Sequence, residues 1–512
     1  MLSKIKSGAV MGIDGYPVTI EADLFKALPA FSIVGLPDGA VRESRERVIA
    51  AIKNSGYKQP RSKIVVNLAP ADIRKEGSVY DLPIAVGLLI ASNQLLSMEH
   101  CRYIIAGELS MGGEVKKIKG ILPVALYARS DPEIRGLIIP AENADEAAMV
   151  EGLNVFPVRT LCDAADVLTR PAEIEPFKSD LNYSLKKSRK YLTDFRDVKG
   201  QEPVKRAAEI AAAGGHNILL IGPPGSGKTM IARRIPTILP DISMDETFET
   251  TKIHSVAGKT DSSSPLIATR PFRAPHHTIS DAGLIGGGAY PRPGEVSLAH
   301  NGLLFLDELP EFKKNVLEVL RQPLEDGEVT ISRAVTSITY PARFMLAVAM
   351  NPCPCGFLTD PRHQCNCTPE KIRRYIDKIS GPLLDRIDIH IEVPALEYED
   401  LSAKKNGESS EEIRSRVNTC REMQLERFRN KKNVFCNAHM ESEDTAIFCE
   451  LDKSGHALLS TAISKLGFSA RAYDRVLKVS RTIADLAGSK KVLAPHIAEA
   501  IQYRNLDRKK MG

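Results

Sequence analysis

The sequence predicts an α/β protein of about three domains, and three observations lead to this expectation. The chain has 512 residues, and one domain for roughly every 150 residues is the usual proportion. Hydrophobic residues make up 43% and charged residues 26%, a composition typical of a globular protein. Between residue 197 and about residue 394, strand-like and helical segments alternate, which favours a parallel sheet with helices on both faces.

Changes in composition divide the chain into five blocks. Residues 1–165 combine short β-rich segments with Ala-rich helical ones. Residues 166–196 carry more charge and proline, so we expect them to form a linker. The alternating block is assigned to residues 197–395, and a charged connector is expected at 396–440. Apolar residues at helical spacing then predict a helical domain over 441–512.

The composition also limits where the protein acts. No apolar stretch approaches the ~20 residues that a membrane-spanning helix needs, and the N-terminal residues lack the apolar region of a secretory signal. Nine cysteines in a chain without such a signal argue against a disulfide framework. We therefore expect a cytoplasmic protein with no membrane partner. An aromatic content of 5% disfavours base stacking as the main binding mode.

The net charge of +5 does not by itself indicate a nucleic-acid partner. Residues 401–512 contain 21 Lys and Arg against 14 Asp and Glu, so the positive charge lies in the C-terminal part. A basic part of this kind can follow a phosphate backbone. It can equally be the solvated face of a helical domain.

The strongest motif is a glycine-rich segment between an apolar strand and a helix. Ile218–Ile221 precedes Gly222–Thr229, which fits the pattern G-x-x-x-x-G-K-[ST]. The glycines let backbone N–H groups point at phosphate oxygens, and the next helix presents its positive end to the same anion. Lys228 is expected at the β- and γ-phosphates and Thr229 at Mg²⁺. The predicted nucleotide-binding residues are Gly222, Pro223, Pro224, Gly225, Ser226, Gly227, Lys228 and Thr229.

Two later apolar segments end in polar residues suited to nucleotide hydrolysis. Residues 302–306 run into Asp307 and Glu308. Asp307 is expected to hold Mg²⁺, and Glu308 to polarise the attacking water as a general base. Residues 344–350 end at Asn351, whose amide can orient the lytic water or can start a turn.

Arg386 follows a predicted helix end and is the candidate source of positive charge for the transition state. Phosphoryl transfer gains much of its rate from cations near the equatorial phosphate oxygens. We expect Arg386 to serve the site of a neighbouring subunit. The alternative is a surface ion pair with Asp385 or Asp388.

Taken together, these motifs resemble those of AAA+ ATPases. Longer segments resemble the magnesium-chelatase-like branch known as the YifB/ComM family, and the resemblance covers nearly the whole chain. The segments that carry it are Pro271-Phe-Arg-Ala-Pro-His-His277, Gly286-Gly-Gly288, Pro293-Gly-Glu295, Thr330-Ile-Ser-Arg-Ala334 and Asn351-Pro-Cys-Pro-Cys-Gly356.

The resemblance implies an AAA+ P-loop parallel-sheet core with a helical C-terminal lid, ATP and Mg²⁺ as cofactors, and a nucleotide-dependent homohexamer. It also implies a role for each matching residue. These are Lys228 and Thr229 as Walker A, Asp307 and Glu308 as Walker B, Asn351 as sensor 1, Arg386 as the arginine finger, and Arg471 as sensor 2, with Arg475 and Arg481 close by in sequence.

The family includes the ComM motor, which drives DNA branch migration in natural transformation. The resemblance therefore implies a motor that acts on DNA, with helicase or branch-migration activity. Residues 329–340 occupy the place of a hairpin in related ring helicases, and Arg333 is the candidate DNA contact; a hairpin arginine would contact phosphate without reading sequence. Arg333 can instead be a solvated hairpin charge. The alternative function is a protein-remodelling or regulatory ATPase with a polypeptide partner.

Residues 1–165 resemble the Lon-protease domain, an α+β domain of the ribosomal S5 domain 2-like fold, most clearly at 81–85 and 106–110. Lon enzymes cleave peptides with a Ser–Lys pair in which the lysine activates the hydroxyl. Here the resemblance places Ile84 at the position of the nucleophile and Leu122 at that of the lysine, with Lys119 nearby. Because an aliphatic side chain cannot attack a carbonyl, we expect no peptidase activity and a scaffolding or DNA-contacting role.

Cys353, Cys355, Cys365 and Cys367 form the one cysteine cluster in the sequence. Four thiolates so close together could bind a structural Zn²⁺ in tetrahedral geometry. The spacing is atypical, since zinc sites usually have two to four residues within each pair. The alternative is that these are reduced cysteines, some of them buried as small hydrophobic residues.

Overall fold

The computed structural model describes residues 2–97, 99–179, 191–260, 266–288, 291–332, 337–395, 407–431, 434–466 and 469–504. The chain divides into two compact units. Unit 1 comprises Met1–Arg189 and Thr247–Ala268, and unit 2 comprises Lys190–Glu246 and Thr269–Gly512. The prediction of an α/β protein with a parallel sheet is confirmed. Among the described residues, no helix is both long enough and apolar enough to cross a lipid bilayer.

Unit 1 is built on a seven-stranded mixed sheet with the strand order β3-β4-β2-β1-β5-β8-β9. The strands are β1 (Leu2–Met11), β2 (Asp14–Phe25), β3 (Ala30–Val34), β4 (Lys63–Ala69), β5 (Tyr103–Ile105), β8 (Gly136–Pro140) and β9 (Asn154–Val158). β1 and β2 form a long antiparallel hairpin in which Leu2 lies opposite Asp23 and Met11 opposite Asp14. Alternate residues of β4 are buried, as expected for a strand with one face on the core.

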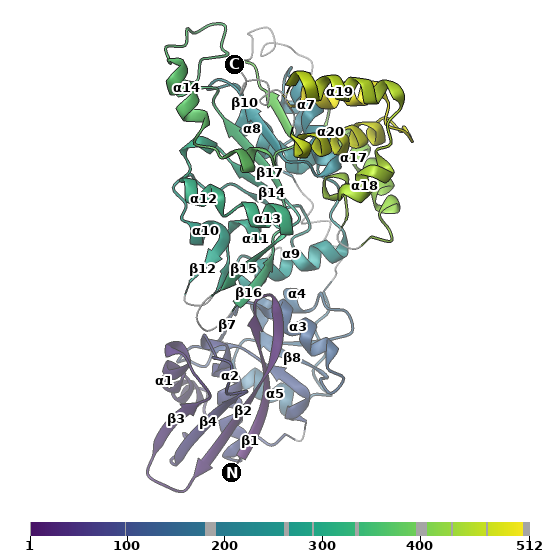
Figure 1. The fold of residues 1–512 in the computed structure, drawn as a ribbon. Helices are drawn as coiled ribbons and strands as arrows, with labels where there is room; N and C mark the ends of the chain where they lie inside the picture. Colours follow the sequence, from purple (N-terminus) through teal and green to yellow (C-terminus); the bar gives the residue numbers. More distant parts are fainter. Residues whose placement is uncertain are drawn as a thin grey trace. The chain divides into compact units, whose positions relative to one another are not determined.

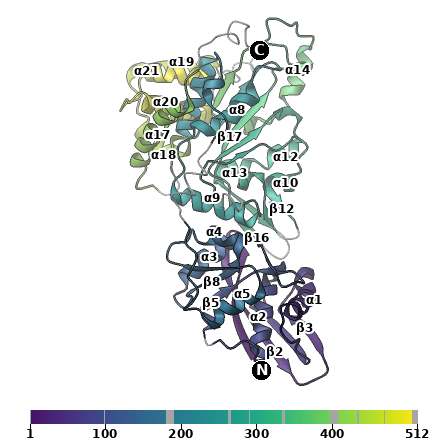
Figure 2. The ribbon, with the colours of Figure 1, turned by 180° about the vertical axis from the view of Figure 1, so that it is seen from behind.

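Helices cover this sheet (Figure 2), and their buried side chains form hydrophobic cores together with those of the strands. The longer ones are α1 (Gly39–Asn54), α2 (Asp81–Ala91), α3 (Ile121–Ser130) and α5 (Leu161–Thr169). α1 begins at Asp38, whose side chain accepts a hydrogen bond from the Val41 backbone N–H, the usual N-cap arrangement. α2 is buried along almost its whole length, because it packs against β1, β2, α1 and α5.

A segment from the middle of the chain completes unit 1. Helix α9 (Met244–Val256) begins in unit 2, and its residues from Thr247 onward belong to unit 1. The Ser255 hydroxyl donates to the buried Glu146 carboxylate, and the Gly120 N–H donates to the Ser255 carbonyl at 3.1 Å. Burial raises the pKa of Glu146. These residues join the N-terminal unit although they lie within the block expected to form the parallel-sheet domain.

Unit 2 contains a five-stranded sheet with the order β11-β14-β17-β10-β18, in which every neighbouring pair is parallel (Figure 1). The strands are β11 (Phe272–Arg273), β14 (Leu303–Leu306), β17 (Met345–Met350), β10 (Ile218–Ile221) and β18 (Ile389–Glu392). The strand order reverses around β10, because the chain passes from β17 on one side of it to β18 on the other. In open parallel sheets, ligands bind at the carboxyl ends of the strands next to such a reversal.

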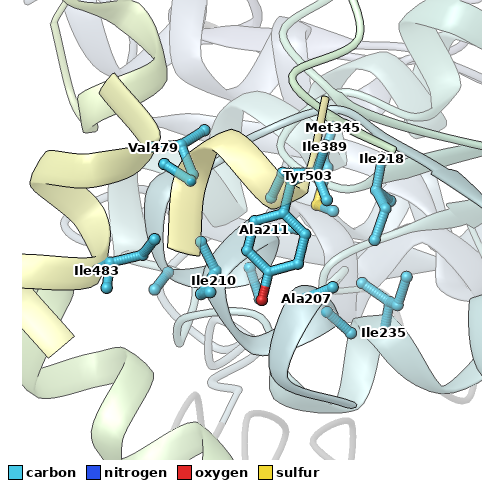
Figure 3. Close-up of a cluster of buried hydrophobic side chains, with 14 of the residues drawn as sticks. Ala207, Ile210, Ala211, Ile218, Ile235, Met345, Ile389, Val479, Ile483 and Tyr503 are labelled. Atoms are coloured by element: carbon cyan, nitrogen blue, oxygen red, sulfur yellow. The ribbon is translucent and has the colours of Figure 1, made fainter. Parts of the chain in front are cut away.

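The C-terminal helices share one hydrophobic core with this sheet. They are α17 (Ser410–Arg427), α18 (Ser442–Phe448), α19 (Lys453–Leu466), α20 (Ala470–Leu486) and α21 (Ala494–Gln502). Figure 3 shows side chains of α20 beside those of α7 (Glu202–Gly214), together with residues of the sheet. The labelled residues are Ala207, Ile210, Ala211, Ile218, Ile235, Met345, Ile389, Val479, Ile483 and Tyr503.

Residues between β14 and β17 form short helices and a hairpin. The helices are α12 (Lys314–Glu318) and α13 (Arg321–Asp326), and the hairpin strands are β15 (Glu328–Ser332) and β16 (Ser337–Pro341). Thr330 lies opposite Thr339, and Ser332 opposite Ser337. The two strands of the hairpin expected over residues 329–340 are therefore observed, paired as β15 and β16.

Candidate nucleotide site

The glycine-rich loop connects β10 to helix α8 (Lys228–Ile238) at the carboxyl edge of the sheet. Gly227 caps the helix with a left-handed backbone, φ 89°, a conformation that favours glycine. A Cβ built at Gly225 would meet no atom within 4 Å, whereas one at Gly222 would lie 2.2 Å from the Val393 carbonyl oxygen. The loop thus packs closely on the sheet on one side and is open on the other, where a phosphate chain has room.

Lys228 is turned back onto this loop. Its Nζ donates hydrogen bonds to the carbonyls of Gly222 at 2.7 Å and Pro223 at 2.9 Å, and to Asn351 Oδ1 at 3.2 Å. Burial lowers the pKa of Lys228, and the nearby carboxylates of Asp307 and Glu308 oppose this lowering. The ammonium is therefore a poorly hydrated cation held against the loop, which suits it to a phosphate.

Thr229 and Asp307 meet across the carboxyl ends of β10 and β14. The Thr229 hydroxyl donates to Asp307 Oδ2 at 2.6 Å. A hydroxyl and a carboxylate oxygen in contact are hard oxygen ligands of the kind that Mg²⁺ prefers, with its remaining positions taken by water and phosphate. The residues present therefore fit a magnesium–nucleotide complex.

Glu308 follows Asp307 in a left-handed backbone conformation, φ 53°, which is uncommon for a residue with a side chain. Its side chain is 58% exposed, and its Oε2 lies 3.6 Å from Nδ1 of His277. The carboxylate is thus accessible to water and faces one imidazole. His277 was not predicted at this position; the available signal is that it follows β11, the strand next to β14.

Asn351 and Gln201 also contact the glycine-rich loop and its lysine. Asn351 follows β17, which pairs with β10 in register from Ile218 to Ile221, so its amide reaches Lys228. Gln201 donates from Nε2 to the Ser226 carbonyl at 3.0 Å and to the Pro394 carbonyl at 3.1 Å. It therefore ties the glycine-rich loop to the end of β18.

Comparison with known proteins identifies the family. Residues 194–401 match the family described as magnesium chelatase, subunit ChlI; residues 20–143 match subunit ChlI of Mg-chelatase, and residues 407–504 its C-terminal part. The chain is 44% identical over 513 residues to the competence protein ComM of Haemophilus influenzae, covering 99% of this chain and 98% of that protein. It is 43% identical over 514 residues to YifB of Escherichia coli, with coverages of 99% and 98%.

The chain belongs to the YifB/ComM family of magnesium-chelatase-like proteins. The family matches support an AAA+-type ATPase, which implies ATP and Mg²⁺ as its ligands. The fold of unit 2 is consistent with that assignment. Over 153 residues the chain is also 29% identical to Lon protease 2 of Bacillus subtilis, covering 28% of this chain and 27% of that protein.

The Arg386 side chain forms an ion pair and a hydrogen bond within unit 2 of its own chain. It is 8% exposed, its Nη2 pairs with the carboxylate of Glu325 on α13, and its Nη1 donates to the Pro382 carbonyl at 2.6 Å. The ion-pair partner is thus Glu325, whereas Asp388 is paired with Arg475 at 2.7 Å. The expectation that Arg386 acts on a neighbouring subunit remains a prediction.

Arg471 lies in the first turn of α20, after the N-cap residue Ser469. Its side chain is exposed. Arg475 and Arg481, the two nearby alternatives, are held by Asp388 and Asp485 respectively. Of the three arginines, Arg471 is the most accessible to a ligand.

Asp388 immediately precedes β18, at the amino end of this strand of the parallel sheet. Its Oδ2 accepts a hydrogen bond from the Asn217 backbone N–H at 3.0 Å and lies 3.4 Å from His216 Nδ1. Burial acts to raise the pKa of Asp388, but Arg475 and His216 outweigh it, and the pKa is well below its ordinary value. The Asn217 side chain donates to the Arg386 carbonyl. This buried network therefore joins α20, the start of β10 and the backbone at Arg386.

The remaining predicted residues are placed as follows. Arg333 lies outside the described residues, between the described ends of β15 and β16. Ile84 and Leu122, which the Lon resemblance is expected to place at the nucleophile and lysine positions, are both fully buried in the hydrophobic cores of unit 1. The four clustered cysteines converge, with all four sulfur atoms within 4.8 Å of one another.

Proposed function

We propose that this protein is an ATP-hydrolysing AAA+ ring motor that acts on DNA, with helicase or branch-migration activity. The observation that carries the ATPase part is the convergence of Lys228, Thr229, Asp307 and Asn351 at one edge of the parallel sheet. Lys228 and Thr229 begin the helix after β10, while Asp307 and Asn351 follow β14 and β17, so three neighbouring strands fix their spacing.

Each residue has a distinct task in this proposal. Lys228 exchanges its loop carbonyls for the β- and γ-phosphates, while Thr229 and Asp307 hold Mg²⁺, which neutralises the developing charge on the phosphates. Glu308 accepts a proton from the attacking water, since its carboxylate is exposed next to Asp307. Asn351 orients that water.

Assembly as a hexamer would complete the site. Arg386 would leave Glu325 and place its guanidinium at the γ-phosphate of the adjacent subunit, where it stabilises transition-state charge. Arg471 would contact the nucleotide from the C-terminal helices of its own chain. Hydrolysis is then possible only in the assembled ring.

The hairpin β15–β16 supports DNA as the substrate. Val329 and Tyr340 are buried, while the opposite face presents hydroxyls paired across the strands. These pairs are Thr330 with Thr339 and Ser332 with Ser337, each with its two side-chain oxygens 2.9 Å apart. Exposed hydroxyl groups, with Arg333 between the two strands in sequence, suit contact with phosphates and not with base edges. The family relative named a competence protein supports the same substrate.

The second candidate, a polypeptide-remodelling ATPase, has less support. Pore loops that grip polypeptides usually carry an aromatic side chain. In the hairpin the one aromatic residue is Tyr340, which is buried and donates to the Pro291 carbonyl at 2.7 Å. The hairpin therefore offers no exposed ring to a threaded polypeptide.

We further propose that residues 1–165 form a Lon-like domain that serves as a scaffold or DNA-contacting collar. The 29% identity to Lon protease 2 supports the relationship. Ile84 and Leu122 leave the positions of the Ser–Lys pair without a nucleophile or a base, so peptidase activity is not expected.

The test is the ATPase rate with single-stranded, duplex and forked DNA at a stated salt concentration. We expect forked DNA to stimulate the wild type, and Arg333→Ala to lose this stimulation while its basal rate stays unchanged. Arg373→Ala is the matched control, because this α14 (Pro369–Ile376) side chain is 86% exposed and lies outside the hairpin. Absence of both stimulation and DNA binding in the wild type would overturn the DNA assignment.

A further inference from the structure

We propose that Cys353, Cys355, Cys365 and Cys367 bind one structural Zn²⁺ ion, and that this ion fixes the loop after Asn351 against the glycine-rich loop. The four sulfur atoms all lie within 4.8 Å of one another. They come from two Cys-x-Cys pairs that nine residues separate in sequence, so the chain must fold back on itself to bring them together.

The sulfur separations match a tetrahedral metal site. The Sγ atom of Cys353 lies 3.3 Å from that of Cys355 and 3.7 Å from that of Cys365, and the Sγ atoms of Cys355 and Cys365 are 3.6 Å apart. Four sulfurs around zinc at about 2.3 Å stand about 3.8 Å apart at the corners of a tetrahedron. A disulfide requires about 2.05 Å, so none of these pairs is a disulfide.

The neighbouring backbone favours thiolates. The Cys367 N–H points at the Cys365 sulfur, with a nitrogen–sulfur distance of 3.5 Å, and N–H donors of this kind stabilise a negatively charged sulfur. Cys367 also precedes Thr368, the N-cap of α14, and the start of a helix favours negative charge. Four thiolates without a cation would repel one another, and Zn²⁺ removes that repulsion.

The ligand set points to a closed site. All four positions are supplied by cysteine, which leaves no open position for water or substrate, so the ion would be structural and not catalytic. Soft thiolate ligands in this number select zinc over Mg²⁺. The site is therefore chemically distinct from the oxygen ligands at Thr229 and Asp307.

The cysteine loop borders the nucleotide site. Cys353 comes two residues after Asn351, whose side chain accepts the hydrogen bond from Lys228. Gly356 has a left-handed φ of 86°, and a Cβ there would lie 2.6 Å from Cδ of Pro224 in the glycine-rich loop. The turn that holds the first two cysteines thus rests directly on that loop. Loss of zinc would release this turn and with it the position of Asn351.

The test is metal analysis of the full-length protein purified without chelator or affinity metal. We expect one zinc per chain in the wild type. Cys353→Ser and Cys365→Ser, each removing one ligand from a different pair, should fall below about 0.2 zinc per chain. Cys101→Ser and Cys162→Ser are matched controls, because these cysteines are exposed and lie outside the cluster; they should keep one zinc. A wild type that holds no zinc, or cluster variants that retain it, would overturn the proposal.

A second measurement covers the case in which the serine variants fail to fold. Cobalt exchanged into the wild type should give the intense visible absorption of a tetrahedral thiolate site, and added zinc should abolish it. A weak, octahedral-type spectrum would contradict the proposal. Neither measurement uses nucleotide, so their outcomes are independent of the proposed ATPase function.

Discussion

Replacing Glu325 with glutamine tests whether Arg386 is held in reserve until the ring forms. In the single chain, the Arg386 guanidinium pairs with Glu325, and it must give up this pair to reach a neighbouring phosphate. The Glu325 side chain is 55% exposed and the Arg386 side chain 10%. Because water screens a pair with one exposed partner, we take its stabilisation as about 0.5–1 kcal/mol.

This magnitude sets the expected change in rate. If release of Arg386 contributes to the barrier, Glu325→Gln should raise kcat by about two- to fivefold, since 1.36 kcal/mol corresponds to a factor of ten. The assay is phosphate release at saturating ATP and a protein concentration at which assembly is complete. Glu318→Gln is the control, because Glu318 pairs with Arg321 at 2.7 Å and should leave kcat unchanged.

The same assay tests whether the effect of Glu325→Gln depends on Arg386. Arg386→Ala is expected to lower kcat by about 10³-fold or more, the usual contribution of an arginine finger. In that background Glu325→Gln should have no further effect. A fall in kcat for Glu325→Gln alone, or an equal rise with and without Arg386, would refute the release model.

Three further predictions concern residues of unit 2. Lys228→Ala should weaken binding of a fluorescent ATP analogue by about a hundredfold or more, because a phosphate-binding cation is lost; near-normal affinity would contradict its role. Glu308→Gln should bind ATP but lower kcat by about 10²–10⁴-fold, and normal turnover would exclude it as the base. Asp388→Asn should destabilise unit 2 by about 3 kcal/mol in thermal unfolding at pH 7, because it leaves Arg475 unpaired. Since the folded-state pKa of Asp388 is lowered, its contribution to the free energy of unfolding is full above about pH 4 and is lost as the pH falls further. Equal melting temperatures of the wild type and Asp388→Asn at pH 7 would contradict this prediction.

The positions of the candidate nucleotide-site residues could be predicted because each follows an apolar segment at a fixed place. The segment predicted at 344–350 is observed as β17, Met345–Met350, and Asp307 follows β14 directly. Parallel strands end at one edge of their sheet, so residues at their carboxyl ends must converge. Sequence periodicity and the P-loop pattern were enough to place Thr229, Asp307 and Asn351 together.

Other features depend on long-range packing that periodicity does not encode. Glu325 and Arg386 are 61 positions apart, and no local pattern pairs them; the sequence offered Asp385 and Asp388 as the alternative partners because both lie within two positions of Arg386. Likewise, nothing in the composition of Thr247–Ala268 indicates that this segment completes unit 1. Such contacts follow from where the chain returns in space, which local sequence leaves open.

The central claim is that Arg386 completes the nucleotide site of a neighbouring copy, and mixing two inactive variants tests it most directly. The Lys228→Ala protein lacks a competent glycine-rich loop but keeps Arg386. The Arg386→Ala protein keeps a competent loop but lacks the arginine. In an equal mixture of randomly assembled rings, about a quarter of the interfaces would combine an intact loop with an intact arginine. The account predicts that ATPase activity reappears on mixing, to about a quarter of the wild-type rate if the sites act independently. Mixed rings, verified by pull-down of a tagged copy, that remain as inactive as either parent would contradict it.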